Sequence, residues 1–392
     1  MKPPRGVLKP GQEWKVCHLL KGLYGLKQAG WGWYKEMSGV FINDLKFKRS
    51  AVDHSVFYWQ NQEKHTIIVI ATNDMAVTSK WIEDVEKFKQ DIKHYWEITD
   101  NHEIKWFLGF EIKHNRIAQT ISISQQSCIH IIIEWFRLTN AKRVMTPFET
   151  GTMLSKELGP STPTQVMQIK GVTYAKAIGC VLWTAVVSRP DIMFVTGVLA
   201  QFVQNPEQPH WEALKRVINY LGWTSDLWLT FSGKPRSDIY GYTDADRASQ
   251  KDQHSTSGYS FHLGQGAITW SSKKQHIIAL SSMEVEYTAL THMAKEALWL
   301  QSMVSEIFRE DRKPVVINCD NQGSIVLSRD NKYHSQMKHI DIRYHFIREA
   351  VKDSKVKVNY VPTEENIADI FNKPLTKSKF GAFTRMVGLA AR

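Results

Sequence analysis

Residues 237–272 read SDIYGYTDADRASQKDQHSTSGYSFHLGQGAITWSS, and this stretch decides the fold. Alternation of apolar and polar residues predicts a strand from Ser237 to Asp244. TSGYSFHL and AITWSS follow at hairpin spacing, and Gly264 and Gly266 supply the turn between them. We therefore expect three antiparallel strands in succession, with Asp244 at the end of the first one.

The segment after these strands is expected to alternate between helix and strand. Residues 282–308 predict a long amphipathic helix, whose apolar stripe consists of Ala289, Met293, Ala297, Leu300 and Val304. PVVINCD, residues 314–320, is short and mostly apolar, which is typical of a buried parallel strand. HIDIRYHFIREAVKD then predicts a helix, KVKVNYV a strand, and ENIADIF a final helix. This order predicts a mixed five-stranded sheet with helices, and the expected fold class of the chain is α/β and α+β.

Acidic residues stand where these elements begin or end: Asp244, Glu286, Asp320 and Asp369. An acid at such a place lies near a core, where an unpaired charge is costly. Hard divalent cations take oxygen ligands and make such a cluster tolerable. Two such ions, about 3.5–4 Å apart, are a standard device for cutting phosphodiesters. Each acid alone can equally be a cap or a surface charge, but the set in this order favours a metal site.

Residues 236–392 resemble the ribonuclease H domain of copia-type retrotransposon polyproteins. The matching stretches, in the order of that family, are GYTDADRA, HSTSGYSFHLG, ITWSSKKQ, ALSSMEVEYTAL, CDNQGSI, KHIDIRYHFIRE and VPTEENIADIFNKPL. The resemblance implies a ribonuclease H fold. It also implies two Mg²⁺ ions, or Mn²⁺ in their place, on four catalytic, metal-binding acids: Asp244, Glu286, Asp320 and Asp369.

Two of these stretches each contain two acids close together, and only one acid of each pair matches a metal ligand of the family. The resemblance matches Asp244 rather than Asp246, and Glu286 rather than Glu284. Glu284 has a structural explanation, because Ser281-x-x-Glu284 is the pattern of a capping box at a helix start.

The rest of the chain resembles the same family. KVCHLLKGLYGLKQAGWGWY, FKRSAVDHSVF, FLGFEI and VMTPFE resemble the back half of a copia-type reverse transcriptase. Residues 173–231 resemble the connecting region. We therefore expect a truncated reverse-transcriptase palm over residues 1–150, a linker and a connecting or thumb-like helical region over 151–232, and a ribonuclease H-like domain over 233–392.

The polymerase motif departs from the family. The family has Tyr-Val-Asp-Asp between two strands, whereas residues 71–74 read ATND after the apolar run TIIVI. Asn73 therefore replaces the first paired acid, and a neutral amide is a poor Mg²⁺ ligand. The third acid of the family lies upstream of the first segment that this chain matches, so only Asp74 remains and we expect no DNA synthesis by this chain alone. A lesser departure is QAGW, which begins at Gln28 where the family has Gln-Ala-Pro-Arg.

Charge and local sequence indicate nucleic-acid partners. The formal net charge is +11, which suits a polyanion such as RNA, DNA or an RNA–DNA hybrid, although a basic surface also serves solubility. Asn321 and Gln322 directly follow Asp320 and either read the 2′-hydroxyl of the RNA strand or cap the helix that begins there. Lys338 and Arg343 are candidate phosphate contacts.

Cysteine usage and hydropathy indicate where the protein works. The cysteines show neither metal nor redox spacing, which is typical of a reducing compartment: Cys17, Cys128, Cys180 and Cys319. No apolar run reaches transmembrane length. We expect an intracellular protein without membrane contact, cytoplasmic in virus-like particles or nuclear.

Two other functions stay open besides cleavage of RNA in RNA–DNA hybrids. One is a decayed, catalytically inactive retroelement relic, which the Asn73 replacement favours. The other is a nucleic-acid-binding or structural subunit that forms a dimer or associates with an intact reverse transcriptase. Survival of all the ribonuclease acids argues for the enzyme.

Overall fold

The computed structural model describes most of the chain. The described residues are 3, 6–7, 10–12, 14–23, 25–61, 64–155, 173–233, 238–247, 254–276, 279, 281–309, 313–329 and 341–391, without the side chains of 341–344. The chain divides into two compact units, Met1–Glu103 and Ile104–Arg392. Each unit has a hydrophobic core of its own. In the described part, every helix is too short or too polar to cross a membrane.

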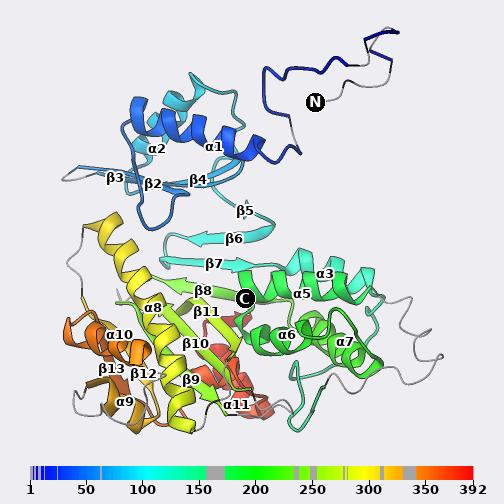
Figure 1. Cartoon of the computed structure of the whole chain (residues 1–392), viewed down its shortest axis with the longest axis vertical. Helices are drawn as coiled ribbons and strands as arrows, with labels where there is room; N and C mark the ends of the chain where they lie inside the picture. Colours follow the sequence, from blue (N-terminus) through cyan, green and yellow to red (C-terminus); the bar gives the residue numbers. More distant parts are fainter. Residues whose placement is uncertain are drawn as a thin grey trace. The chain divides into compact units, whose positions relative to one another are not determined.

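The first unit is an antiparallel sheet, in the order β1-β2-β3-β4, with helices on one side (Figure 1). Strand β3 alternates strictly, so that Ile68 and Ile70 are buried against Phe41 and Phe88 from the helical segments. The elements are α1 (Ala29–Gly39), η1 (Val40–Asp44), β1 (Lys48–Arg49), β2 (Val56–Gln60), β3 (His65–Ala71), β4 (Asp74–Ser79) and α2 (Ile82–Lys93).

The second unit contains an antiparallel sheet in the order β14-β8-β7-β6-β5. Its strands are β5 (Trp106–Phe107), β6 (Phe110–Asn115), β7 (Thr120–Ser124), β8 (Leu227–Ser232) and β14 (Leu389–Ala391). Ile123 pairs with Leu229, and Leu229 pairs with Leu389, so the last described strand of the chain lies next to β8, which in turn lies next to β7.

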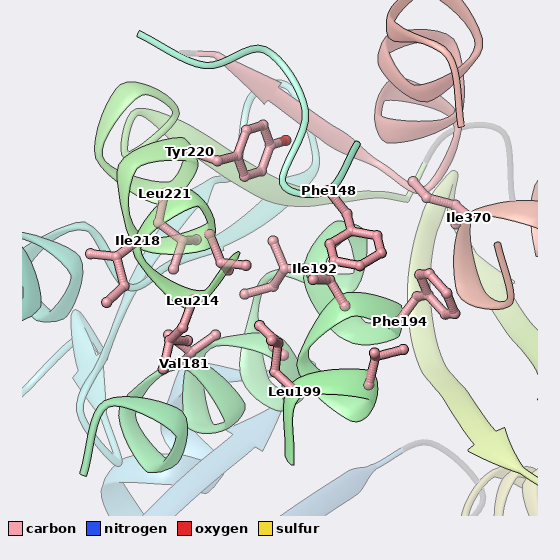
Figure 2. Close-up of a cluster of buried hydrophobic side chains, with 14 of the residues drawn as sticks. Phe148, Val181, Ile192, Phe194, Leu199, Leu214, Ile218, Tyr220, Leu221 and Ile370 are labelled. Carbon is pink, nitrogen blue, oxygen red and sulfur yellow. The ribbon is translucent and has the colours of Figure 1, made fainter. Parts of the chain in front are cut away.

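Helices next to this sheet build the largest core of the second unit. They are α3 (Gln126–Trp135), α5 (Tyr174–Val187), η3 (Pro190–Ile192), α6 (Met193–Ala200) and α7 (Gln208–Trp223). Figure 2 shows this core, in which Ile370 from near the end of the chain lies beside Phe194 of α6. This packing fixes the neighbourhood of Asp369, the residue before Ile370.

The other sheet of the second unit is mixed, in the order β11-β10-β9-β12-β13. The three strands β9, β10 and β11 are antiparallel, and β12 runs parallel to both β9 and β13. The elements are β9 (Tyr240–Asp246), β10 (Thr256–Leu263), β11 (Gly266–Lys274), α8 (Ser282–Phe308), β12 (Val315–Cys319), α9 (Gln322–Arg329), α10 (Asp341–Lys352), β13 (Val356–Tyr360), η4 (Ile367–Phe371) and α11 (Lys377–Met386).

These elements confirm the predicted fold class, a mixed five-stranded sheet with helices. Helix α8 has the predicted bounds, and Ser281 caps it by accepting the backbone N–H of Glu284 at 3.2 Å. The predicted helix in ENIADIF is wrong in type, because residues 367–371 form a 3₁₀ turn that Asn366 caps through the N–H of Ala368.

The compact units divide at a place other than the predicted boundary at residue 150. Residues 104–150 lie in the second unit, because β7 pairs with β8 and because Ile129 and Ile132 of α3 are buried with Leu214. The predicted boundary at 232 likewise falls inside this unit, where β8 pairs with the C-terminal strand β14.

Candidate metal centre

Two of the predicted acids lie at one edge of the mixed sheet. Strands β9 and β12 are parallel neighbours, and their register pairs Thr243 with Cys319. Asp244 follows Thr243 in β9, and Asp320 directly follows the end of β12. The two acids therefore lie side by side at the carboxyl ends of these strands. The carboxyl ends of neighbouring parallel strands are the usual place for ligands in open α/β sheets.

Helix α8 brings the third acid to this edge. Its neighbours Val285 and Tyr287 are buried, and Glu286 itself is only 8% exposed. One ligand atom each from Glu286, Cys319 and Asp320 lie within 4.8 Å of one another. The pKa of the Cys319 thiol is raised, mainly by burial and also by Glu286, which leaves the carboxylate oxygens as the candidate ligands.

The 3₁₀ turn η4 brings the fourth acid. Asp369 is completely buried, and Asn366 ties the turn to β9 by donating to the Thr243 carbonyl at 3.0 Å. Gly258, which pairs with Asp244 across the sheet, permits this approach. A Cβ at Gly258 would lie 2.7 Å from Cβ of Phe371 and 3.0 Å from the Ala368 carbonyl oxygen.

The cluster concentrates negative charge. The pKa of Glu286 is raised well above its usual value by burial and by the charges of Asp244 and Asp320. The pKa of Asp320 is also raised, by burial and by Asp244. One oxygen of Glu286, Oε2, is buried without a hydrogen-bond partner among the described residues. Oxygen donors, burial and mutual repulsion together fit a hard divalent cation.

The Asp244–Asp369 side of the cluster has cationic and amide partners. Asn372 Nδ2 donates to Asp244 Oδ2 at 2.6 Å. Lys373 Nζ lies 2.5 Å from Asp369 Oδ1 and 3.4 Å from Asp244 Oδ2, and Lys379 Nζ lies 2.6 Å from Asp369 Oδ2. These partners balance much of the charge on this side.

The pKa values of the two acids on this side are shifted in opposite directions. Burial opposes ionisation of Asp244, but hydrogen bonding with Asp369 and the charge of Lys373 hold the pKa of Asp244 below its usual value. Burial, followed by the hydrogen bond with Asp244, raises the pKa of Asp369 to about 6.

Sequence reasoning missed these partners: Asn372, Lys373 and Lys379. One signal was present, because Lys373 follows Asp369 by four residues, the spacing at which side chains meet on a helical face. The other two partners come into place through the turn and through α11, neither of which has a strong sequence pattern.

The predicted nucleic-acid contacts stay predictions. Asn321 accepts the N–H of Ser324 at 2.8 Å and therefore caps α9, one of its two predicted roles. Gln322 is the first residue of that helix and is exposed. Lys338 lies outside the described residues, and so does the side chain of Arg343.

The altered polymerase motif forms a tight hairpin in the first unit. Ala71 pairs with Asp74 across it, and Thr72 has a φ of 56°. Asn73 and Asp74 are exposed. Gln28 precedes helix α1, and its carbonyl accepts the N–H of Gly32 at 3.0 Å. Among the described residues, the close set of three potential metal ligands lies in the second unit and not at this hairpin.

Comparison with known proteins finds relatives along nearly the whole chain. Residues 1–150 match the family model described as Reverse transcriptase (RNA-dependent DNA polymerase). The chain is 36% identical, over 99% of its length, to the Retrovirus-related Pol polyprotein from transposon TNT 1-94 of Nicotiana tabacum. It is 32% identical, also over 99%, to the Pol polyprotein from transposon RE1 of Arabidopsis thaliana.

The chain spans only 29% and 26% of the length of these two relatives. A crystal structure of LC11-RNase H1 in complex with an RNA/DNA hybrid matches 34% of this chain and 94% of its own, at 16% identity and a TM-score of 0.28. The alignment with the Pol polyproteins covers nearly the whole chain, and the strand order of the mixed sheet is consistent with the same family. The chain belongs to the family of copia-type retrotransposon Pol polyproteins, and it joins a reverse transcriptase segment to a ribonuclease H-like fold.

Proposed function

We propose that the second unit cleaves the RNA strand of RNA–DNA hybrids with the help of divalent metal ions, Mg²⁺ or Mn²⁺. One observation supports this most strongly: Asp244, Glu286, Asp320 and Asp369 come from four separate elements and meet at one end of the mixed sheet. A fold gains no stability from gathering like charges, so their convergence points to a cation and to chemistry.

The residues of this centre have separate tasks. Glu286, Asp320 and Asp244 would hold a metal ion with carboxylate oxygens, and Asp369 would complete the second site together with Asp244. Ions bound there supply an activated water for attack and a counter-charge for the leaving 3′ oxygen. Asn372 orients Asp244 by its 2.6 Å hydrogen bond, and Asn366 fixes the turn that carries Asp369.

Recognition of the hybrid is expected to depend on shape and on the 2′-hydroxyl rather than on base edges. We assign hydroxyl reading first to Gln322, because it is exposed beside Asp320, whereas Asn321 already caps α9. Because the reverse transcriptase segment has Asn73 in place of an acid, we propose that this chain alone does not synthesise DNA.

Substrate choice tests this proposal. The purified chain is given labelled RNA–DNA hybrid, RNA duplex and DNA duplex of the same sequence, in Mg²⁺. We expect cleavage of the RNA strand in the hybrid alone. Asp353→Asn is a matched control, since Asp353 is half exposed and pairs only with Lys355 at the surface. Equal cleavage of the RNA duplex, or of DNA, would contradict the assigned substrate.

A further inference from the structure

The two sides of the carboxylate cluster are neutralised differently. On one side, both oxygens of buried Asp369 contact ammonium groups, Oδ1 that of Lys373 and Oδ2 that of Lys379. Lys373 also reaches Asp244 at 3.4 Å. On the other side, no lysine or arginine of the described residues lies within ion-pair distance of Glu286 or Asp320, on which the charge of Lys373 acts only from farther away. The cluster is therefore electrostatically asymmetric.

The lysines on the first side are not equivalent. Lys373 touches two acids, whereas Lys379 contacts Asp369 and, at 3.4 Å, the Thr363 carbonyl. If Lys373 swings away, Lys379 still pairs with Asp369, so the buried acid is not left without a counter-charge. The Lys373 side chain is 32% exposed, and a lysine is a compact charge on a flexible stem. Lys373 can therefore reach solvent without rearrangement of the fold.

We propose that Lys373 is a built-in counter-ion that occupies the Asp244–Asp369 side of the centre and must leave before a divalent ion binds there. Glu286 and Asp320 have no such lysine among the described residues, so the ion that they hold together with Asp244 binds without displacing one. The centre then binds its two ions unequally, one strongly and one weakly. This inference rests on the proposed function, because it concerns the metal ions of the same site.

A purely structural role for Lys373 predicts something different. If Lys373 only pairs with the buried Asp369, its loss would lower stability and leave metal binding unchanged. A counter-ion that competes with the metal predicts that its removal strengthens the weaker binding event. The two roles are therefore separated by metal affinity and not by stability alone.

Calorimetric titration of the full chain with MnCl₂ tests the inference. For the parent we expect two binding events that differ at least about tenfold in affinity, since a unit charge a few ångströms away acts strongly on a divalent ion. In Lys373→Met the weaker event should strengthen at least about tenfold, while the stronger one changes little. Lys357→Met, on the exposed face of β13, is the matched control and should behave as the parent.

A second variant and the comparison with Asp320→Asn make the test decisive. If Lys373→Met does not fold without metal, Lys373→Gln replaces it and should give the same strengthening. Two events of equal affinity in the parent, or an unchanged weaker event in both variants, overturn this inference and leave the proposed function standing. A parent that binds no more Mn²⁺ than Asp320→Asn overturns the proposed function itself.

Discussion

The β3–β4 hairpin and the carboxylate cluster of the mixed sheet are the two places where the sequence predicts metal-binding acids, and they differ in burial. Asn73 and Asp74 are neighbours in sequence at an exposed turn. The acids of the cluster come from four elements and are mostly buried. An exposed acid adds nothing to the core, so its replacement by Asn leaves the fold intact. A buried acid cluster persists only with counter-charges, which here are Lys373, Lys379 and, we propose, metal ions.

The sharpest difference should appear when one acid of each site is neutralised. Glu286→Gln is expected to lower hybrid cleavage by roughly a thousandfold or more, as for a residue of a catalytic unit. In EDTA the same variant should be more stable than the parent, because a repelling buried charge has been removed. Cleavage rates and thermal unfolding measure the two effects.

Asp74→Asn is the matched substitution at the hairpin. Because Asp74 is exposed, neither cleavage nor unfolding temperature should change. A loss of cleavage in Asp74→Asn would break the comparison, since it would give the hairpin a part in the ribonuclease reaction.

The stability of the sheet end away from Asp244 should depend on pH, because His262 of β10 lies there opposite Tyr240 of β9. His262 is buried between neighbouring strands, stacks on Tyr240 at 5.4 Å, and has its pKa lowered to about 4 by burial. A lowered histidine pKa means that the unfolded chain binds the proton first. Stability is therefore complete above about pH 6.5 and is lost as the pH falls from there toward 4, by up to about 3 kcal/mol.

Denaturant unfolding at several pH values checks this prediction. His262→Gln should lose most of the pH dependence between 6.5 and 4. If the variant and the parent lose stability in parallel over that range, another group is responsible.

Contact between η4 and the sheet should tolerate no added methyl group. In Gly258→Ala the new Cβ would meet Phe371 and the Ala368 carbonyl, so we expect a loss of about 1–3 kcal/mol and reduced cleavage through displacement of Asp369. Gly381→Ala is the control, because nothing lies within 4 Å of its added Cβ in helix α11, and it should gain about 0.5–1 kcal/mol. Chemical denaturation measures both.

The smallest expected effects separate capping from substrate recognition beside Asp320. Asn321→Ala should cost about 1 kcal/mol through loss of the α9 cap. Gln322→Ala should leave stability unchanged and reduce the preference for RNA over DNA in the cleaved strand. If Gln322→Ala prefers RNA over DNA as strongly as the parent does, a different residue recognises the 2′-hydroxyl.

Sequence reasoning succeeded where local pattern and fold agree. The stripe that includes Ala289 and Met293 and the cap at Ser281 fixed both ends of α8, and the apolar run before Asp320 identified a buried parallel strand. Resemblance supplied the rest of the strand order.

The misses have physical reasons. Lys373 has the four-residue spacing from Asp369, but Lys379 meets Asp369 only because η4 is a tight 3₁₀ turn followed by α11, and no sequence pattern predicts that geometry. The pairing of Leu389 with Leu229 joins segments far apart in the chain, so no local signal places β14.

Cleavage of a labelled RNA–DNA hybrid by the purified chain, compared with Asp320→Asn, tests the central claim most directly. The account predicts cleavage of the RNA strand by the parent in Mg²⁺ or Mn²⁺, no cleavage in EDTA, and a loss of roughly a thousandfold or more in the variant. A well-folded parent that leaves the hybrid intact in both metals would contradict the account and identify the chain as a retroelement remnant without ribonuclease activity.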